Sequence, residues 1–317
     1  MRQTGVKSTR RSWIHKKLLH LFWRTIGFLP DSPYVSLKYF SLSGRLPNLT
    51  SPMLFTEKLQ VLKLADRNPL YPVMVDKDRA KDLIAERVGP EHVIETYWVG
   101  QDLDQIGWNE IPLPAVVKPT HSSGYGLFLR TPRDVEDLVR NNPGPYWLAQ
   151  RHDAINREWA YADVVPQIII ERMLTNHGAI PDDYAFLVFS GEVALIRLRL
   201  RRDGDAFECI FTPDWQRIPE GGGCYPDYPD TISRPAQLDA MIEVARKVSG
   251  GVPFVRVDLY LAEGSVYVGE LTLYPGGGFP GFVSDPIDCY LGEFWDAQLK
   301  ARAPARPVQS AVALGIE

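Results

Sequence analysis

Apolar residues in the second half of the chain alternate with polar ones or cluster in short runs, the pattern typical of β-strands. Ser190-Gly191-Glu192 separates two such segments, as expected for the turn of a hairpin. In the first half, two shorter apolar segments flank a loop of small residues, 120–126. The expected strands are residues 114–119, 127–129, 167–170, 184–189, 193–200, 254–260 and 265–273.

Helical periodicity is present in three other segments. Asp76 is a suitable N-cap for the first helix, and Gly89 stands where a C-cap belongs. Thr131 can cap the second helix, and Pro235 can open the third, which ends at Gly250-Gly251. The expected helices are residues 76–88, 131–139 and 235–249, and residues 141–147 are expected to form a loop.

Composition and charge narrow the class of protein. The chain has 317 residues, of which 45% are hydrophobic and 23% charged, as in folded soluble proteins. The net charge of −4 argues against a nucleic-acid partner. Cys209, Cys224 and Cys289 are scattered, which argues against a zinc site or a disulfide framework. We find no apolar run of about 20 residues and no signal peptide, so a cytoplasmic location is expected.

The first thirty residues differ from the rest, because seven Lys and Arg residues precede the first acidic one. Trp13, Leu18, Phe22 and Trp23 are interleaved with them. One interpretation is an amphipathic helix, residues 1–28, lying peripherally on an anionic membrane surface. The other is an arm docked onto the body by its aromatic residues. The pattern leaves both open.

The last two strands carry candidate metal ligands. On the first, Arg256 and Asp258 share a face, and Glu270 lies on the second. A three-residue loop, 262–264, would place Arg256 opposite Glu270 and make Asp258 and Glu270 diagonal neighbours. Val266, Val268, Glu270 and Thr272 would then share a face.

A two-residue loop would instead separate the two carboxylates, so the metal hypothesis predicts the longer loop. Two carboxylates without sulfur or imidazole ligands suit Mg²⁺. The alternative is a surface strand with an ordinary Arg–Glu pair.

Lys118 ends an apolar strand directly before the small-residue loop 120–126. Backbone amides of such a loop can approach phosphate groups closely, and a lysine beside it adds positive charge. An ordinary hairpin turn explains the same pattern. Glu171 follows the expected strand 167–170, where a linker can offer backbone groups to an adenine edge, although a plain strand end is an equal explanation.

Taken in order, these features resemble the ATP-grasp superfamily, and more closely its teichuronopeptide-biosynthesis (TupA-like) branch, over about residues 50–295. Each motif alone is unspecific, and the combination carries the resemblance. The motifs are Phe55-Thr56-Glu57-Lys58-Leu59-Gln60, Asp66-Arg67-Asn68-Pro69-Leu70-Tyr71, Asp76-Lys77, Val117-Lys118-Pro119, Arg157-Glu158-Trp159, Pro181-Asp182-Asp183-Tyr184, residues 253–260 and residues 269–276.

The resemblance implies an α+β ATP-grasp fold, with a nucleotide cleft between a small central subdomain and a C-terminal antiparallel-sheet subdomain. A helical N-terminal region would precede them. The implied divisions are a basic arm at 1–30, an N-terminal region at 31–112, the central subdomain at 113–174, the C-terminal subdomain at 175–301 and a tail at 302–317.

The resemblance also implies ATP and Mg²⁺ as cofactors and assigns roles to individual residues. Lys77 and Lys118 would bind phosphates, and Arg256 would steady the transferred phosphoryl group together with Lys118. The remaining implied contacts are Ser122, Ser123, Gly124 and Gly126 in a phosphate lid, Glu171, Arg172, Met173 and Leu174 around adenine, Asp183 at the ribose, and Asp258, Glu270 and Thr272 at the metal.

Two positions depart from the family pattern. Thr272 stands where the superfamily often has asparagine, and Tyr125 stands in a lid that is usually richer in glycine.

The implied activity is that of a carboxylate–amine ligase, which activates an acid as an acyl phosphate and joins it to an amine. The product would carry an amino acid or amine on a cell-surface polysaccharide component or its precursor. Alternatives are a phosphotransferase, a glycosyltransferase-associated protein of polysaccharide synthesis, and a nucleotide-binding partner without turnover.

Overall fold

The computed structural model describes residues 22–302, except 24, 220–224 and 282. The basic arm up to residue 21, most of the expected membrane contact at 1–28 and the tail from 303 therefore lie outside the described residues. Trp23 is described, and it is buried against Tyr34, with ring centroids 5.5 Å apart. No helix within residues 22–302, as described, has the length and apolar content to cross a membrane.

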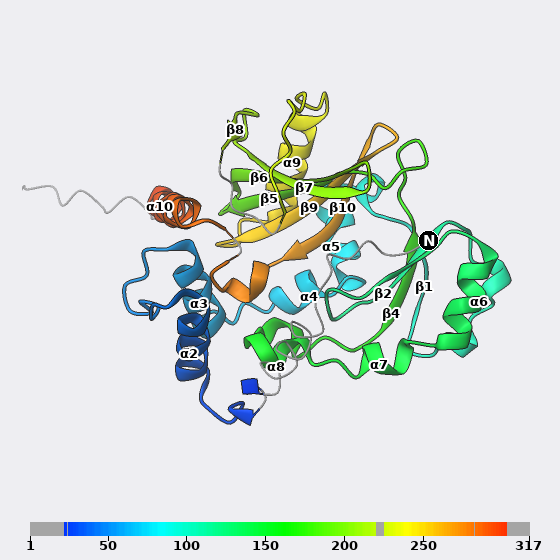
Figure 1. Cartoon of the computed structure of the whole chain (residues 1–317), viewed down its shortest axis with the longest axis horizontal. Coiled ribbons are helices and arrows are strands. Elements are labelled where there is room, and N and C mark those ends of the chain that lie inside the picture. Colours follow the sequence, from blue (N-terminus) through cyan, green and yellow to red (C-terminus); the bar gives the residue numbers. More distant parts are fainter. Residues whose placement is uncertain (1–21, 24, 220–224, 282, 303–317) are drawn as a thin grey trace, which may run out of the picture.

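The larger of two antiparallel sheets has the strand order β10-β9-β5-β6-β7-β8 (Figure 1). Its central hairpin turns at Ser190-Gly191, as predicted. Positive φ angles of 52° and 89° at these two residues suit the tight turn. The strands are β5 (Asp183–Phe189), β6 (Glu192–Arg202), β7 (Asp205–Phe211), β8 (Arg217–Ile218), β9 (Val255–Ala262) and β10 (Ser265–Thr272).

The smaller sheet has the order β1-β4-β2-β3 and lies beside the larger one. Its edge strand β1 comes from the stretch 31–112 and pairs with β4. The strands are β1 (Thr96–Gly100), β2 (Ala115–Pro119), β3 (Leu127–Leu129) and β4 (Ile168–Arg172). Since β4 extends to Arg172, Glu171 lies inside the strand and not after it, contrary to the prediction.

Helices cover both sheets. The predicted helix after Asp76 is α5, and the Asp76 carboxylate accepts hydrogen bonds from the amides of Asp78 and Arg79. The stretch 141–147, expected to be loop, contains the start of α7, because Pro143-Gly144-Pro145 opens a short helix. The helices are α2 (Asp31–Ser43), α3 (Phe55–Ala65), α4 (Tyr71–Val75), α5 (Arg79–Val88), α6 (Pro132–Asn141), α7 (Gly144–Leu148), α8 (His152–Asn156), α9 (Leu238–Ser249) and α10 (Asp285–Arg302).

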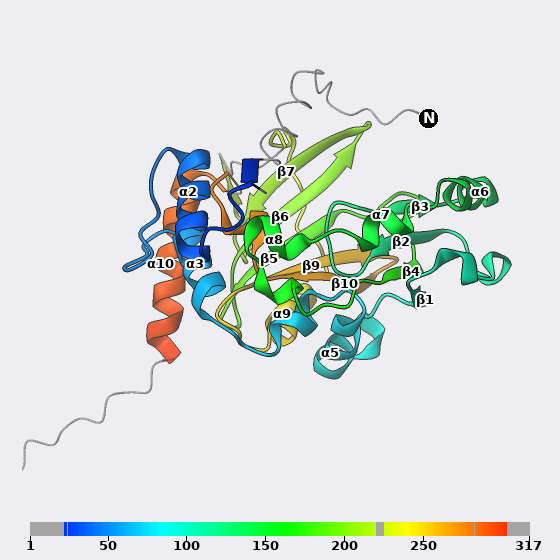
Figure 2. The ribbon, with the colours of Figure 1, turned by 90° about the horizontal axis from the view of Figure 1, so that it is seen from below.

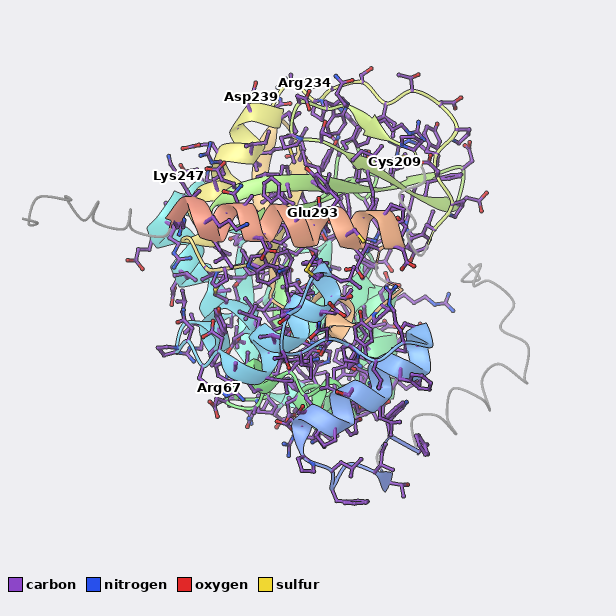
Figure 3. The ribbon with its side chains drawn as sticks, turned by 90° about the vertical axis from the view of Figure 1, so that its left-hand side faces the viewer. Arg67, Cys209, Arg234, Asp239, Lys247 and Glu293 are labelled. Atoms are coloured by element: carbon purple, nitrogen blue, oxygen red, sulfur yellow. The ribbon has the colours of Figure 1, made fainter. Side chains whose placement is uncertain are left out.

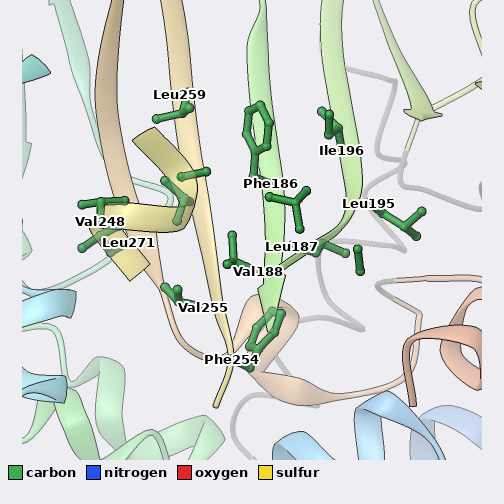
Figure 4. Close-up of a cluster of buried hydrophobic side chains, with 14 of the residues drawn as sticks. Phe186, Leu187, Val188, Leu195, Ile196, Val248, Phe254, Val255, Leu259 and Leu271 are labelled. Carbon is green, nitrogen blue, oxygen red and sulfur yellow. The ribbon is translucent and has the colours of Figure 1, made fainter. Parts of the chain in front are cut away.

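The main hydrophobic core lies between α9 and the larger sheet. Figure 4 shows part of it, with Phe186 and Val188 of β5, Val255 and Leu259 of β9, and Val248 of α9. Alternate residues of β9 are fully buried there, so the residues between them face the opposite side of the sheet. That opposite face carries the candidate site.

The N-terminal helices α2 and α3 pack with α10 at the end of the molecule remote from α6 (Figure 2). The buried carboxylate of Asp288 accepts hydrogen bonds from the amide and hydroxyl of Thr56 at 2.8 and 2.7 Å. Figure 3 shows α10 crossing this side, with the exposed Glu293 on its outer surface. The motif around Phe55 therefore joins the two ends of the described chain.

Candidate active site

The candidate metal ligands lie on β9 and β10, which a two-residue turn, Glu263-Gly264, connects. The predicted three-residue loop is therefore wrong, since Ala262 pairs with Ser265. A regular ladder from that turn would turn Glu270 toward the core. Instead, a bulge absorbs Gly269, and Glu270 lies directly opposite Asp258.

The bulge also changes which residues of β10 share a face. Val266 and Val268 are buried in the core, whereas Glu270 and Thr272 line a cavity on the other side. The predicted common face of Val266, Val268, Glu270 and Thr272 is thus wrong. Arg256 pairs with Thr272 and not with Glu270.

Arg256 binds the Asp258 carboxylate through two hydrogen bonds, from Nε to Oδ1 at 2.7 Å and from Nη2 to Oδ2 at 2.5 Å. Glu270 lies 4.0 Å from Arg256 Nη2 and 3.5 Å from Lys77 Nζ. Burial would raise the pKa of Glu270, but Lys77 and Arg256 hold it below its usual value. For Asp258, burial outweighs Arg256 and raises the pKa.

A second charge cluster lies on the smaller sheet, where Lys118 of β2 donates to Oε1 of Glu171 on β4. Lys81 of α5 lies 3.1 Å from the other oxygen, Oε2. Burial would raise the pKa of Glu171, but these two ammonium groups lower it. Sequence reasoning missed Lys81, because nothing in the helical pattern distinguishes it from a solvent-exposed lysine.

A cavity of about 270 Å³ lies between the two sheets beside this cluster. Val116, Lys118 and Phe128 line it from the smaller sheet, and Tyr260 lines it from the larger one. The predicted adenine residues Glu171, Arg172, Met173 and Leu174 also line it. The amides of Arg172 and Met173 donate to the carbonyls of Glu95 and Pro114, whereas that of Leu174 has no backbone partner among the described residues.

Of the predicted lid residues, Gly126 lines the 270 Å³ cavity, whereas Ser122, Ser123 and Gly124 do not. Lys77 Nζ donates to the carbonyl oxygen of Ser122 at 2.7 Å, so Lys77 joins the lid to Glu270. Ser122 is buried, whereas Ser123, Gly124 and Gly126 are exposed. Tyr125 contacts Tyr146 of α7 edge to face, with ring centroids 5.9 Å apart. Tyr125, which departs from the family pattern, therefore connects the lid to a helix that was not predicted from the sequence.

Asp183 begins β5, opposite Tyr260 on β9 and Arg199 on β6. Burial and the nearby Asp258 raise its pKa to about 7. It does not line the 270 Å³ cavity as the described residues form it, so its predicted contact with ribose stays a prediction.

A second cavity, of about 180 Å³, lies beside Glu270. Glu270, Thr272 and Arg256 form one part of its lining, and His152 and Glu158 form another. Sequence reasoning assigned no role to His152 or Glu158. The only signal was the motif Arg157-Glu158-Trp159, which spacing alone could not connect to the metal ligands.

The donor set fits a magnesium ion. Asp258 and Glu270 supply carboxylate oxygens, and the hydroxyl of Thr272 is buried without a hydrogen-bond partner among the described residues. The described part of the chain contains no group of three or more His, Cys, Asp or Glu side chains suited to a metal. A cation here would take its other ligands from water and phosphate, as Mg²⁺ usually does.

The known structures to which this chain is similar are remote in sequence. D-alanine–D-alanine ligase from Bacillus anthracis has 14% identity and a TM-score of 0.44, covering 72% of this chain and 65% of that one. The ATP-grasp ligase PsnB in complex with a minimal precursor has 15% identity and a TM-score of 0.41, covering 94% and 77%. This chain therefore spans less than two thirds of the D-alanine ligase.

No curated protein matches the sequence at the threshold used. The family model described as TupA-like ATPgrasp, by contrast, matches residues 57–295, well over half of the chain. The chain therefore belongs to the TupA-like ATP-grasp family, and its cofactors are ATP and Mg²⁺.

Proposed function

We propose that this protein is a MgATP-dependent carboxylate–amine ligase that acts through an acyl phosphate. The observation that carries the proposal is the position of the Asp258–Glu270 pair. On the face of β9 away from the core, Asp258 lies between Tyr260 and Arg256. Tyr260 lines the 270 Å³ cavity, and Arg256 lines the second cavity together with Glu270. Two cavities with the carboxylate pair close to both suit a reaction in which a phosphoryl group passes from a nucleotide in one cavity to a substrate in the other.

In this proposal the 270 Å³ cavity holds adenine, and the amide of Leu174, which has no backbone partner among the described residues, donates to a ring nitrogen. Lys118 and Lys77 bind the phosphates, and Asp183 takes the ribose hydroxyls. The lid residues Ser122, Ser123, Gly124 and Gly126 close over the phosphates through their backbone amides. Glu171 holds Lys118 and Lys81 in place, and Arg172 and Met173 complete the wall.

Asp258, Glu270 and the hydroxyl of Thr272 would hold Mg²⁺. When bound, the ion neutralises phosphate charge and orients the terminal phosphoryl group. Arg256 already lies within 4.0 Å of both carboxylates, and it would steady the phosphoryl group during transfer.

The reaction needs no protein nucleophile. A substrate carboxylate oxygen attacks the γ-phosphorus, the bond to the ADP oxygen breaks, and an acyl phosphate forms. An amine nitrogen then attacks the acyl carbon, the carbon–oxygen bond breaks, and inorganic phosphate and a proton leave. The side chains position the reactants and balance their charges.

The proposal also concerns the identity of the two substrates. The resemblance to the teichuronopeptide branch supports an amino acid or amine joined to an acidic group of a cell-surface polysaccharide or its precursor. Such a reaction would take place at the inner face of the membrane, where peripheral contact by residues 1–28 would be useful.

Incubation of the purified protein with MgATP and a panel of carboxylates and amines tests the proposal. We expect mass analysis to find ADP, phosphate and a new amide. Asp258→Asn and Glu270→Gln should abolish the product. The matched controls are Asp239→Asn and Glu293→Gln, two exposed carboxylates on the remote surface labelled in Figure 3, which should leave it unchanged.

A phosphorylated acceptor without an amide would indicate a phosphotransferase. If no mixture yields ADP while both site variants bind ATP as the wild type does, the protein is a nucleotide-binding partner without turnover.

A further inference from the structure

The 180 Å³ cavity beside the carboxylate pair contains a buried acid that the proposed reaction has not yet used. Glu158 is 3% exposed and lines this cavity. Its Oε1 accepts a hydrogen bond from Nδ2 of Asn156 at 2.9 Å. No residue within the described range donates to its Oε2.

Glu158 has no lysine or arginine within 4.0 Å among the described residues. Burial raises its pKa to about 7, although Lys63 and Lys38 act from further away to lower it. Its one ion-pair contact within 4.0 Å, among the residues described, is His152 Nε2 at 3.9 Å. Burial and nearby Lys77 lower the pKa of His152 to about 4, so that imidazole is neutral near pH 7. Burial makes the charged form of the Glu158 carboxylate costly, and a ligand that brings a positive charge to contact distance would stabilise that form.

The two lysines behind Glu158 are bound elsewhere. Lys63 Nζ donates to the carbonyl of Gly277 at 2.7 Å. Lys38 Nζ donates to the carbonyl of Ile155 and to Oδ1 of Asn156, at 2.8 and 2.7 Å. Asn156 thus joins Lys38 to Glu158 and orients the carboxylate from behind. A Cβ on Gly277 would come within 2.8 Å of Asn156, so glycine allows this close packing.

The charge around the cavity favours a cation over an anion. Its acidic and basic side chains are Glu158, Glu270, Arg256 and His152. Asp258 already binds Arg256 through two hydrogen bonds, and His152 is neutral. Glu270 faces Lys77 at 3.5 Å, so Glu158 is the carboxylate of this lining that remains to meet a ligand. A volume of about 180 Å³ suits a small group or one end of a larger substrate.

We propose that this cavity is the amine subsite, in which Glu158 and the ring nitrogen of His152 accept hydrogen bonds from the amino or ammonium group of the amine substrate. The ligand class is a primary amine or the amino end of an amino acid. This inference rests on the proposed ligase function, because it supplies that reaction's second substrate. It places the nitrogen in a cavity that Glu270, Thr272 and Arg256 also line, next to the transferred phosphoryl group.

Ligand-observed NMR on the full chain, saturated with Mg²⁺ and a non-hydrolysable ATP analogue, tests the subsite. The probes are ethanolamine, glycine and D-alanine, with acetate as an anionic comparison. We expect saturable amine binding by the wild type and no acetate binding. Glu158→Gln keeps an acceptor for Asn156 but removes the charge, so it should weaken amine binding about tenfold or more.

The matched control is Asp288→Asn, which neutralises another buried carboxylate far from the cavity and should bind amines as the wild type does. If Glu158→Gln does not fold, Lys63→Met together with Glu158→Gln removes one buried charge of each sign and should show the same loss. Equal amine binding by the wild type and either Glu158 variant overturns the inference, as does binding of acetate alone.

A titration of the protein with the MgATP analogue alone distinguishes failure of this inference from failure of the proposed function. If the analogue binds and no amine does, the subsite is wrong and the nucleotide site stands. If the protein binds no MgATP analogue at all, the proposed function fails first.

Discussion

Glu270 lies directly opposite Asp258 because β10 contains one residue more than β9 between the turn and this pair. The extra residue is Gly269, and the space beside it is narrow. A Cβ there would lie 2.5 Å from Cε2 of Tyr260, which lines the 270 Å³ cavity. The bulge thus couples the alignment of the carboxylates to the wall of the proposed adenine site.

Gly269→Ala should therefore weaken nucleotide binding. The new methyl group would force the Tyr260 ring to turn, and we expect the Kd of ATP to rise about tenfold, or about 1.4 kcal/mol. Calorimetric titration measures the effect. Gly107→Ala is the control, because its Cβ would meet only the flexible Glu110 side chain at 3.3 Å. Unchanged affinity in Gly269→Ala would contradict the prediction.

Thr272→Val separates a metal ligand from a structural hydroxyl. The buried hydroxyl has no partner among the described residues, so its removal should leave the free energy of unfolding unchanged or raise it by up to about 1 kcal/mol. A metal role instead predicts that more Mg²⁺ is needed for half-maximal ADP formation. Thr272→Asn supplies an amide oxygen and should retain the wild-type Mg²⁺ requirement. An unchanged requirement in Thr272→Val would exclude the hydroxyl as a ligand.

Glu171 should make stability depend on pH. Its pKa lies below the ordinary value of 4.5, so its stabilising effect is fully present above that pH and is lost as pH falls through the lower folded-state pKa. Glu171→Gln should cost about 3 kcal/mol near pH 7, because it leaves Lys118 and Lys81 without their carboxylate. Urea denaturation between pH 7 and about pH 3 measures both effects.

At pH 7 the wild type should have the larger free energy of unfolding, and its difference from Glu171→Gln should shrink as the solution is acidified. The exposed Glu293→Gln serves as the control and should follow the wild-type curve. Parallel curves for wild type and Glu171→Gln would show that the carboxylate is not stabilised by its two lysines.

Asp288→Ala should destabilise the contact between the N-terminal helices and α10. It removes both hydrogen bonds to Thr56 and leaves a buried amide and hydroxyl unpaired. We expect a loss of about 2–4 kcal/mol of unfolding free energy. The double variant with Thr56→Val should cost less than the sum of the single changes, and full additivity would contradict the coupling.

The apolar runs of β5 and β6 and the helical periodicity of α9 were readable in the sequence, because these elements pack in the main core. Helices α2, α3 and α10 and strands β1, β7 and β8 were not among the elements predicted from the sequence. The short helix α7 was not predicted either, because two prolines and a glycine in its opening turn read as a loop. Its start depends on tertiary packing, in which Trp147 joins the core of the smaller sheet.

The candidate metal ligands Asp258 and Glu270 lie on neighbouring strands as predicted, but they are brought together by a different register. The two-residue turn and the bulge at Gly269 each shift the predicted register by one residue in the same direction. Together they return Glu270 to the predicted side of the sheet, but opposite Asp258 and not Arg256. Periodicity cannot detect such a pair of shifts. The neighbourhood of Glu158 was also beyond prediction, because α8 and β10 meet there from stretches more than a hundred residues apart.

In the structure, Lys118 binds Glu171, Lys77 faces Glu270, and Arg256 binds Asp258. Each cation proposed to meet phosphate thus already has an internal counterion. Nucleotide entry would then be an ion exchange within the protein, in which phosphate oxygens replace carboxylates as partners of the cations and Mg²⁺ takes the carboxylates released. Such an exchange changes the local charge little, so nucleotide affinity should vary less with ionic strength than in a site of unpaired cations.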